Sequence, residues 1–282
     1  MMNNPTITKS TLPGVNVLLM GPSGTGKTHA IGTLVEAGVE VHVLFLESGM
    51  ESLFGYWTDA GKPIPPNLHW HQLAAPKADF ASMLEDATKI SQLSLDALAK
   101  MTDPNKSKHN QFRSLLEALN NFPDDRSGQK LGAVNSWGPD KALVIDGMAG
   151  LGRAAMSLVI GGKAVKSQSD WGIAQDQVEK LLRMLCDGCQ CHFILLAHVE
   201  RETDMVLGGV KLMVATLGRA LAPKIPAMFS DVILTVRDGT TWKWDTASAQ
   251  ADVKTRNLAI AAANPPSFGP VVMKWKSRGG AL

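Results

Sequence analysis

The sequence has few cysteines and no long apolar run. Its three cysteines, Cys186, Cys189 and Cys191, lie too close together to form a disulfide framework, which fits a reducing compartment. No stretch reaches the roughly 18 consecutive apolar residues of a membrane span. The N-terminal residues lack the basic segment and apolar run of a secretion leader. These absences together favour a cytoplasmic protein.

The sequence also lacks a large excess of positive or negative charge. Charged residues make up 19% of the chain and the net charge is only +2, so a nucleic-acid partner would have to bind local clusters. The 282 residues, 45% of them hydrophobic, suffice for one large α/β domain. We expect a flexible tail over 1–14, a core over 15–260 with a polar surface insertion at 101–137, and a C-terminal tail over 261–282.

One motif is highly specific. The segment 21–28 is a complete G-x-x-x-x-G-K-[ST] phosphate loop, made of Gly21, Pro22, Ser23, Gly24, Thr25, Gly26, Lys27 and Thr28. An apolar segment over 15–20 predicts a strand before it, and a helix is predicted after it. Lys27 is expected to reach the β- and γ-phosphates of ATP, and the Thr28 hydroxyl to bind Mg²⁺.

Acidic residues follow two further predicted strands. Asp146 ends the apolar run 142–145, the Walker B arrangement, and is expected to hold Mg²⁺. Glu47 follows the run 40–46, and ligands of parallel sheets lie beyond the carboxyl ends of the strands. We therefore predict that Glu47 orients or deprotonates the attacking water. The alternative is an acid favoured only by the positive end of the next helix.

Two more features concern histidine and cysteine. His198 ends the predicted strand 192–197 and is expected to contact the γ-phosphate or its water; the alternative is a buried, hydrogen-bonded histidine. His69 and His71 share a face of the predicted strand 68–73, which without a third ligand is weak evidence for metal. The spacing of the three cysteines would allow them to bind zinc, although the predicted strand 192–197 that follows requires Cys191 as a small apolar residue.

Basic residues gather in two segments, 147–170 and 199–226. The functional interpretation is a pair of loops that contact the backbone of single-stranded DNA. The alternative for 147–170 is a helix and a solvated turn, and in 199–226 charge alone is weak evidence. Lys274, Trp275 and Lys276 form a similar basic stretch that could equally be a frayed end. The candidate DNA contacts in the two loops are Arg153, Lys163, Lys166, Arg201 and Lys211.

The remaining patterns predict ordinary elements. Spacing of apolar residues over 78–100 predicts an amphipathic helix. A strand over 231–236, the turn Asp238–Gly239 and a returning strand over 241–246 predict a C-terminal β-hairpin, with Trp242 and Trp244 on one face.

These motifs together resemble the core of RecA-like ATPases, over about residues 15–260. The stretches 144–151, 197–200 and 253–257 more narrowly resemble phage-encoded RecA-like ATPases related to single-strand annealing proteins. The resemblance implies an α/β fold with a mainly parallel sheet flanked by helices, and ATP hydrolysis with Mg²⁺. It also implies a homo-oligomeric ring or filament, in which Lys254 and Arg256 reach the neighbouring subunit's γ-phosphate.

The function that this resemblance implies is an ATPase that assembles on single-stranded DNA and serves phage recombination, annealing or repair. The alternative is a P-loop ATPase that acts as an assembly or switch factor on proteins and does not bind DNA. A kinase is less favoured, because Glu47 and Asp146 together with Lys254 and Arg256 suit hydrolysis at a subunit interface.

Overall fold

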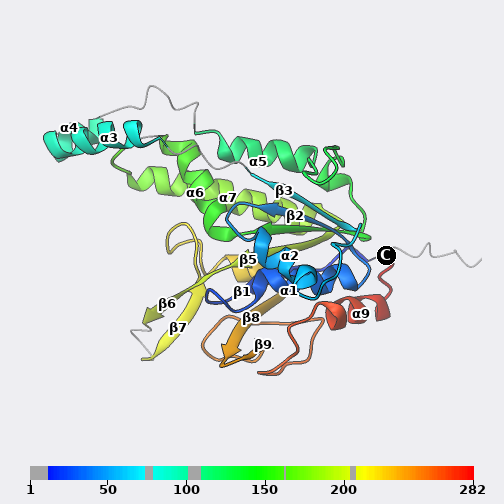
Figure 1. Ribbon diagram of the computed structural model, residues 1–282. Coiled ribbons are helices and arrows are strands. Elements are labelled where there is room, and N and C mark those ends of the chain that lie inside the picture. The colour runs from blue at the N-terminus through cyan, green and yellow to red at the C-terminus, as the bar shows by residue number, and fades with distance from the viewer. Residues whose placement is uncertain (1–11, 74–78, 101–108, 162, 204–207) are drawn as a thin grey trace, which may run out of the picture.

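Seven strands form one sheet in the computed structural model, which describes residues 12–73, 79–100, 109–161, 163–203 and 208–282. The strand order is β3-β2-β4-β5-β1-β8-β9, and every neighbouring pair is parallel except the antiparallel hairpin β8–β9 (Figure 1). The strands are β1 Asn16–Met20, β2 Glu40–Phe45, β3 Leu68–Gln72, β4 Lys141–Asp146, β5 His192–Ala197, β8 Asp231–Asp238 and β9 Thr241–Asp245. A second, two-stranded antiparallel sheet pairs β6 Val199–Thr203 with β7 Val210–Val214.

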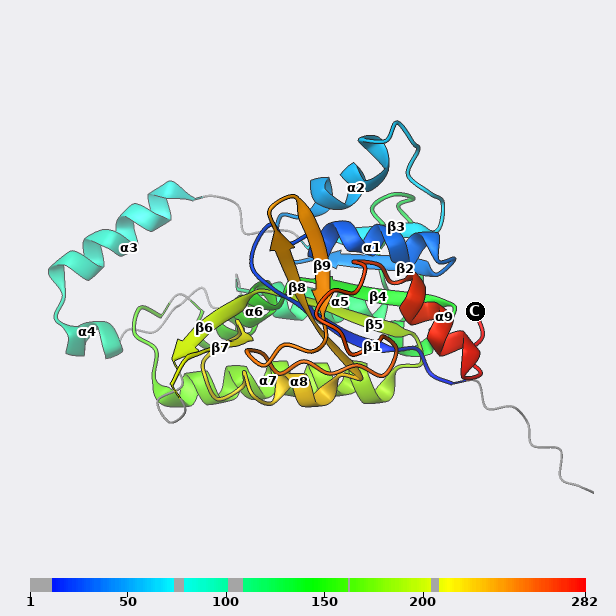
Figure 2. The same ribbon diagram turned by 90° about the horizontal axis from the view of Figure 1, so that it is seen from below.

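Helices cover both faces of the large sheet (Figure 2). They are α1 Lys27–Glu36, α2 Met50–Thr58, α3 Phe80–Gln92, α4 Leu95–Lys100, α5 Gln111–Asn120, α6 Met148–Ile160, α7 Gln168–Gly188, α8 Ile225–Met228 and α9 Gly269–Ser277, with a short 3₁₀ turn at Val134–Ser136. None of the described helices combines the length and hydrophobicity that crossing a membrane requires.

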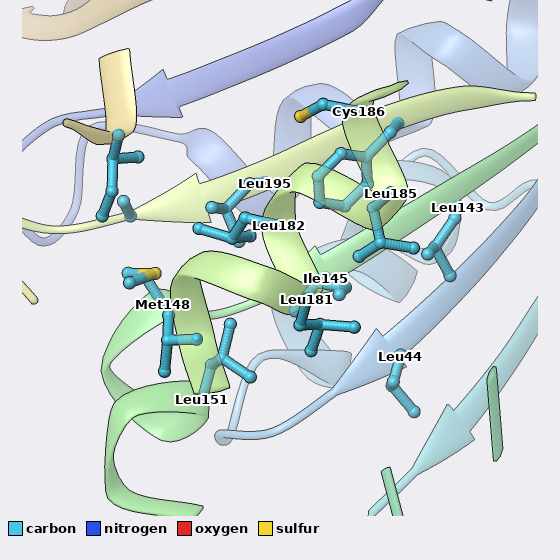
Figure 3. Packing of buried hydrophobic residues seen from close by; sticks show 14 of the residues in the cluster. Leu44, Leu143, Ile145, Met148, Leu151, Leu181, Leu182, Leu185, Cys186 and Leu195 are labelled. Carbon is cyan, nitrogen blue, oxygen red and sulfur yellow. The ribbon is translucent and has the colours of Figure 1, made fainter. Parts of the chain in front are cut away.

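The apolar runs of the sequence are continuous because each central strand buries both of its faces. In β1, Leu18 and Met20 pack with α5, α6 and α7, whereas Val17 and Leu19 pack with α1, α2 and α9. Figure 3 shows the first of these layers, in which leucines of α7 lie against the strands. Strand alternation therefore divides one apolar sequence between two cores.

The structure corrects the predicted surface insertion. Its residues 101–108 lie outside the described part of the chain, but α5 and the segment after it pack onto the sheet. Leu115 and Phe122 are fully buried, and Val134 and Trp137 nearly so. The sequence predicts the helix, around 112–119, but the polar residues on both sides of it gave no sign that the segment packs onto the sheet.

A matched pair of substitutions on α5 tests this packing. Leu115 is 0% exposed and its neighbour Leu116 is 43% exposed. We expect Leu115→Ala to lower the free energy of unfolding by about 2–5 kcal/mol, because it opens a cavity. Leu116→Ala should cost less than about 1 kcal/mol. Urea denaturation of both variants measures the difference, and equal small losses would restore the picture of a loose surface insertion.

The predicted tails are only partly tails. Residues 1–11 lie outside the described part of the chain, but the Trp275 indole donates a 2.8 Å hydrogen bond to the Pro13 carbonyl. The predicted C-terminal tail contains α9, which packs against α1 with Val271, Val272 and Trp275 buried. Trp275 is 3% exposed, so its ring is not available for contact with a nucleic acid, and this stretch is not a frayed end.

The amphipathic helix predicted over 78–100 becomes two helices, α3 and α4, which extend away from the sheet (Figures 1 and 2). Asp79 caps α3 by accepting a hydrogen bond from the Ser82 amide. The helix buries none of its residues, and Phe80 is 80% exposed. The apolar spacing thus predicted helical structure here, although the chain forms two helices and the apolar side of α3 is exposed.

Candidate nucleotide-binding site

The phosphate loop turns as its glycines predict. Gly24 and Gly26 have φ of 74° and 78°, in the left-handed region that side chains other than glycine rarely adopt. Helix α1 begins directly afterwards at Lys27. This places the amino end of α1, with its free N–H groups and partial positive charge, at the loop where phosphates bind in such folds.

The hairpin β8–β9 holds the loop from outside. The hydroxyls of Thr25 and Thr235 lie 2.6 Å apart, and the Trp242 indole donates a 3.2 Å hydrogen bond to the Gly24 carbonyl. Sequence analysis did not connect either residue of the hairpin with the loop. Such contacts join positions more than 200 residues apart, and the only available signal was that Trp242 shares a strand face with the buried Trp244.

Lys27 lies inside the loop. Its amine donates hydrogen bonds of 2.9 and 2.8 Å to the carbonyls of Gly21 and Pro22. Burial lowers the pKa of this amine from 10.5 to about 8, and the nearby Asp146 opposes the shift. The desolvated cation is thereby available for a ligand that carries negative charge.

The two predicted Mg²⁺ ligands meet. The Thr28 hydroxyl donates a 2.8 Å hydrogen bond to an Asp146 carboxylate oxygen, although the residues come from α1 and the end of β4. Burial raises the pKa of Asp146 from 3.8 to about 6, and the hydrogen bond from Thr28 opposes this shift. Hydroxyl and carboxylate oxygens are the hard donors that Mg²⁺ prefers.

Glu47 follows β2 at the same edge of the sheet. Helix α6 approaches it closely, since a Cβ on Gly150 would lie 2.7 Å from Leu46 Cβ and 3.2 Å from Glu47 Cγ. Any larger residue at position 150 would push α6 and this strand end apart. The Glu47 carboxylate accepts a hydrogen bond from the guanidinium of Arg153, on α6. Arg153, a predicted DNA contact, is therefore the ion-pair partner of the predicted base.

One cavity of about 690 Å³ joins these groups. Its size is that of a small-molecule site. His198 lines it from the end of β5 as an exposed side chain, so the alternative of a buried histidine is wrong. Desolvation, followed by the charge of Lys27, lowers the pKa of His198, which keeps the ring neutral at pH 7. The predicted residues that line the cavity are Ser23, Gly24, Thr25, Gly26, Lys27, Thr28, Glu47, Asp146 and His198.

No model of a known protein family matches the chain, and no curated protein matches it. Among solved structures, it is similar to a prototypical ATPase from the type III secretion system of pathogenic bacteria, with 13% identity, a TM-score of 0.38, and coverage of 80% of this chain and 53% of that one. It is also similar to the flagellar accessory protein FlaH from Methanocaldococcus jannaschii, with 10% identity, a TM-score of 0.31, and coverage of 90% and 84%. The chain spans about half the length of the secretion-system ATPase.

The chain's own architecture matches the predicted fold class. A mainly parallel sheet carries helices on both faces, a phosphate loop follows its first strand, and an antiparallel hairpin closes its C-terminal side. The fold is that of a RecA-like P-loop NTPase. Asp146 ends β4, which is separated from the phosphate-loop strand β1 by β5 alone.

The predicted DNA contacts are divided. Arg153, Lys166 and Arg201 line a second cavity of about 640 Å³ between α6, α7 and the β6–β7 sheet. Glu200 and Glu202 also line it. The other two candidates have acidic partners: Lys163 lies 3.2 Å from Asp170, and Lys211 lies 2.9 Å from Asp252.

Lys254 and Arg256 lie away from their own phosphate loop. Lys254 bridges to Val232, at the amino end of β8, and the Arg256 amide donates to the Asp231 carboxylate. Neither residue lines the nucleotide cavity. Burial and the neighbouring Arg256 lower the pKa of Lys254. Their contact with a neighbouring subunit's γ-phosphate stays a prediction.

The cysteines are free and buried. Among the described residues, they do not form a group with metal-ligand spacing; the group that does is Glu40, His42 and His69. His71, which the sequence paired with His69, lies 2.9 Å from the Asp125 carboxylate. His69 and His71 therefore have different carboxylate partners, and among the described residues His71 is not part of a group with metal-ligand spacing.

Proposed function

We propose that the protein is a Mg²⁺-dependent ATPase. The observation that carries this proposal is the single cavity in which the phosphate loop, the Thr28–Asp146 pair, Glu47 and His198 converge. The amino end of α1 and Lys27 would bind the phosphates of ATP. A Mg²⁺ ion held by Thr28 and Asp146 would neutralise charge that develops on the transferred phosphoryl group.

Glu47 and His198 would act on the water. A carboxylate at the strand end accepts the proton of the attacking water, and a neutral imidazole can donate a hydrogen bond to a phosphate oxygen. In the structure, however, Arg153 already occupies the Glu47 carboxylate. Since the guanidinium occupies a carboxylate oxygen that would otherwise accept the proton of the water, the Arg153–Glu47 pair would restrain hydrolysis until Arg153 is withdrawn.

We further propose that single-stranded DNA withdraws Arg153 from Glu47. This activity would place the protein in DNA recombination, annealing or repair. Arg153 lies between the two cavities: it lines one and contacts Glu47, which lines the other. Lys166 and Arg201 share its cavity, and Trp171 supplies an aromatic ring there. Four basic and two acidic side chains line this cavity. Its excess of positive charge, together with an aromatic ring, would suit a single strand, whose phosphates would compete with Glu47 for the guanidinium.

The test is the rate of ATP hydrolysis with and without single-stranded DNA, in the wild type and in Arg153→Gln. We expect DNA to stimulate the wild type, with a stimulation that falls as salt rises. Arg153→Gln should raise the DNA-free rate by up to about fivefold, the value of an exposed ion pair, and lose the stimulation. Arg183→Gln, which removes an exposed arginine paired with Glu179 on α7, is the matched control and should change neither rate.

The outcomes separate the proposals. If Arg153→Gln raises the basal rate but DNA has no effect on the wild type, the restraint on Glu47 stands and the partner is a protein, as the alternative function requires. If the substitution leaves the basal rate unchanged, the ion pair does not restrain hydrolysis. If no variant hydrolyses ATP, the proposed ATPase itself is wrong.

A further inference from the structure

A second cluster of chemically competent side chains lies on the edge of the sheet, outside the nucleotide cavity. Glu40 and His42 are two residues apart on β2 and therefore share a face, and His69 stands opposite His42 in the parallel register of β2 and β3. β3 is the edge strand next to β2 (Figure 1). We call Glu40, His42 and His69 the edge cluster. One nitrogen or oxygen atom from each lies within 4.8 Å of the others.

The distances within the edge cluster suit a small metal ion. His42 Nε2 lies 3.4 Å and His69 Nε2 lies 3.7 Å from Glu40 Oε1. A tetrahedral ion with bonds of about 2.0–2.1 Å requires ligand atoms about 3.4 Å apart. Two imidazoles and one carboxylate are a ligand set that zinc uses when it keeps one position open. The Glu40 side chain is 34% exposed, so solvent can reach the fourth position.

His69 is oriented by a buried carboxylate. Its Nδ1 lies 3.1 Å from Asp124 Oδ2, and Asp124 is only 1% exposed. The Ser127 hydroxyl fixes that carboxylate further with a 2.6 Å hydrogen bond. A carboxylate on Nδ1 places the proton there, which leaves the Nε2 lone pair facing Glu40 and His42.

His42 lacks the hydrogen bonds that a buried imidazole requires. The side chain is 0% exposed, and neither ring nitrogen makes a hydrogen bond of good geometry, although Nε2 lies 3.4 Å from Glu40 Oε1. Its ring packs against those of His69 and Trp137, with centroids 4.9 and 4.2 Å away. Buried polar groups normally have a binding partner. Because hydrogen bonds do not supply one for the His42 ring, and potential metal ligands surround it, a metal ion is a candidate partner.

A lysine neutralises the cluster from the other side. Lys141, opposite Glu40 on β4, places its amine 2.6 Å from Glu40 Oε1, the oxygen that faces both histidines. Its side chain is 25% exposed and flexible, so the amine can move into solvent. A cation at the cluster and the ammonium of Lys141 would compete for one oxygen atom.

We propose that Glu40, His42 and His69 bind a divalent transition-metal ion of the zinc class, which displaces the Lys141 amine from Glu40. The ion would join the edge strand β3 to β2 near the amino ends of both strands. The phosphate loop lies beyond the carboxyl end of β1, so the proposed metal site is separate from the Mg²⁺ ligands of the nucleotide cavity.

The experiment titrates Zn²⁺ into the full chain by calorimetry, with Mg²⁺ in excess to occupy oxygen-only sites. Co²⁺ absorption serves as a second readout, because thiolate ligation from the cysteines would add a charge-transfer band. We expect one Zn²⁺ per chain in the wild type and no thiolate band. Glu40→Gln and His69→Gln should weaken Zn²⁺ binding by at least about 100-fold, and Asp124→Asn by about 10- to 100-fold.

Two variants make the test specific. Lys141→Gln should tighten Zn²⁺ binding by about five- to tenfold, since it removes the competing cation; misfolding cannot produce such a gain. His71→Gln, two residues along β3 and also paired with a carboxylate, should bind Zn²⁺ as the wild type does. The proposal is overturned if the wild type binds no Zn²⁺, if His69→Gln binds as tightly as wild type, or if Lys141→Gln fails to tighten binding.

Discussion

A Lys27→Ala variant is expected to lose ATP turnover by at least about 10³-fold. The Lys27 amine is the cation of the loop, held 2.9 and 2.8 Å from two loop carbonyls in a desolvated position. A charge in such a position interacts with phosphate far more strongly than one in water, and its effect is largest when charge builds up in the transition state. Steady-state hydrolysis of Mg²⁺–ATP measures the loss.

Lys62→Ala provides the control, because Lys62 is exposed and lines neither cavity. It should hydrolyse ATP at the wild-type rate. Thermal melting of both variants establishes that the loss is not unfolding. Wild-type turnover in a folded Lys27→Ala variant would mean that ATP is hydrolysed elsewhere.

Glu47→Gln is expected to lower kcat by about 10²-fold or more while ATP still binds. The substitution keeps the size and polarity of the side chain and removes its basicity, and losing a general base costs roughly this much. Single-turnover hydrolysis together with equilibrium binding of ATP separates the two effects. Glu51→Gln, which changes an exposed acid that lines the same cavity from α2, is the matched control and should retain most of its kcat.

The same variant tests the restraint by Arg153. If Arg153 acts only through the Glu47 carboxylate, adding Arg153→Gln to Glu47→Gln should not raise the rate, although Arg153→Gln alone does. An equal gain in both backgrounds would show that Arg153 acts on something other than Glu47. A parallel loss of ATP affinity and kcat in Glu47→Gln would instead indicate a structural carboxylate.

Sequence analysis predicted the parts of the site that depend on residues adjacent in the sequence. Gly24 and Gly26 permit the turn of the phosphate loop, so the motif itself predicts its geometry. The apolar strands predict the positions of Glu47 and Asp146, because each acid lies at or just after the end of a strand. Parallel strands bring their carboxyl ends to one edge, so the convergence of these residues follows from the strand pattern.

The parts that were missed depend on contacts across the fold. The ion pair of Arg153 with Glu47 joins positions 106 residues apart, and charge alone predicted Arg153 as a DNA contact. The edge cluster required the register of β2 on β3, which sets His42 opposite His69. Strand spacing showed that His69 and His71 share a face, but not which carboxylates lie opposite them.

The position of β1 has a consequence for how the protein is made. Among the described strands β1 is synthesised first, yet its two neighbours are β5 and β8, which come from the last third of the 282-residue sequence. At about 5–20 residues per second, the roughly 200 residues between β1 and β8 take on the order of 10–40 s to translate. Until β5 emerges the apolar strand β1 has neither of its sheet neighbours, and until β8 and β9 emerge the hairpin cannot hold the phosphate loop. The surroundings of the phosphate loop are therefore complete only after β8 and β9 have been synthesised, and a chain truncated before β8 would leave one edge of β1 unpaired and exposed to aggregation.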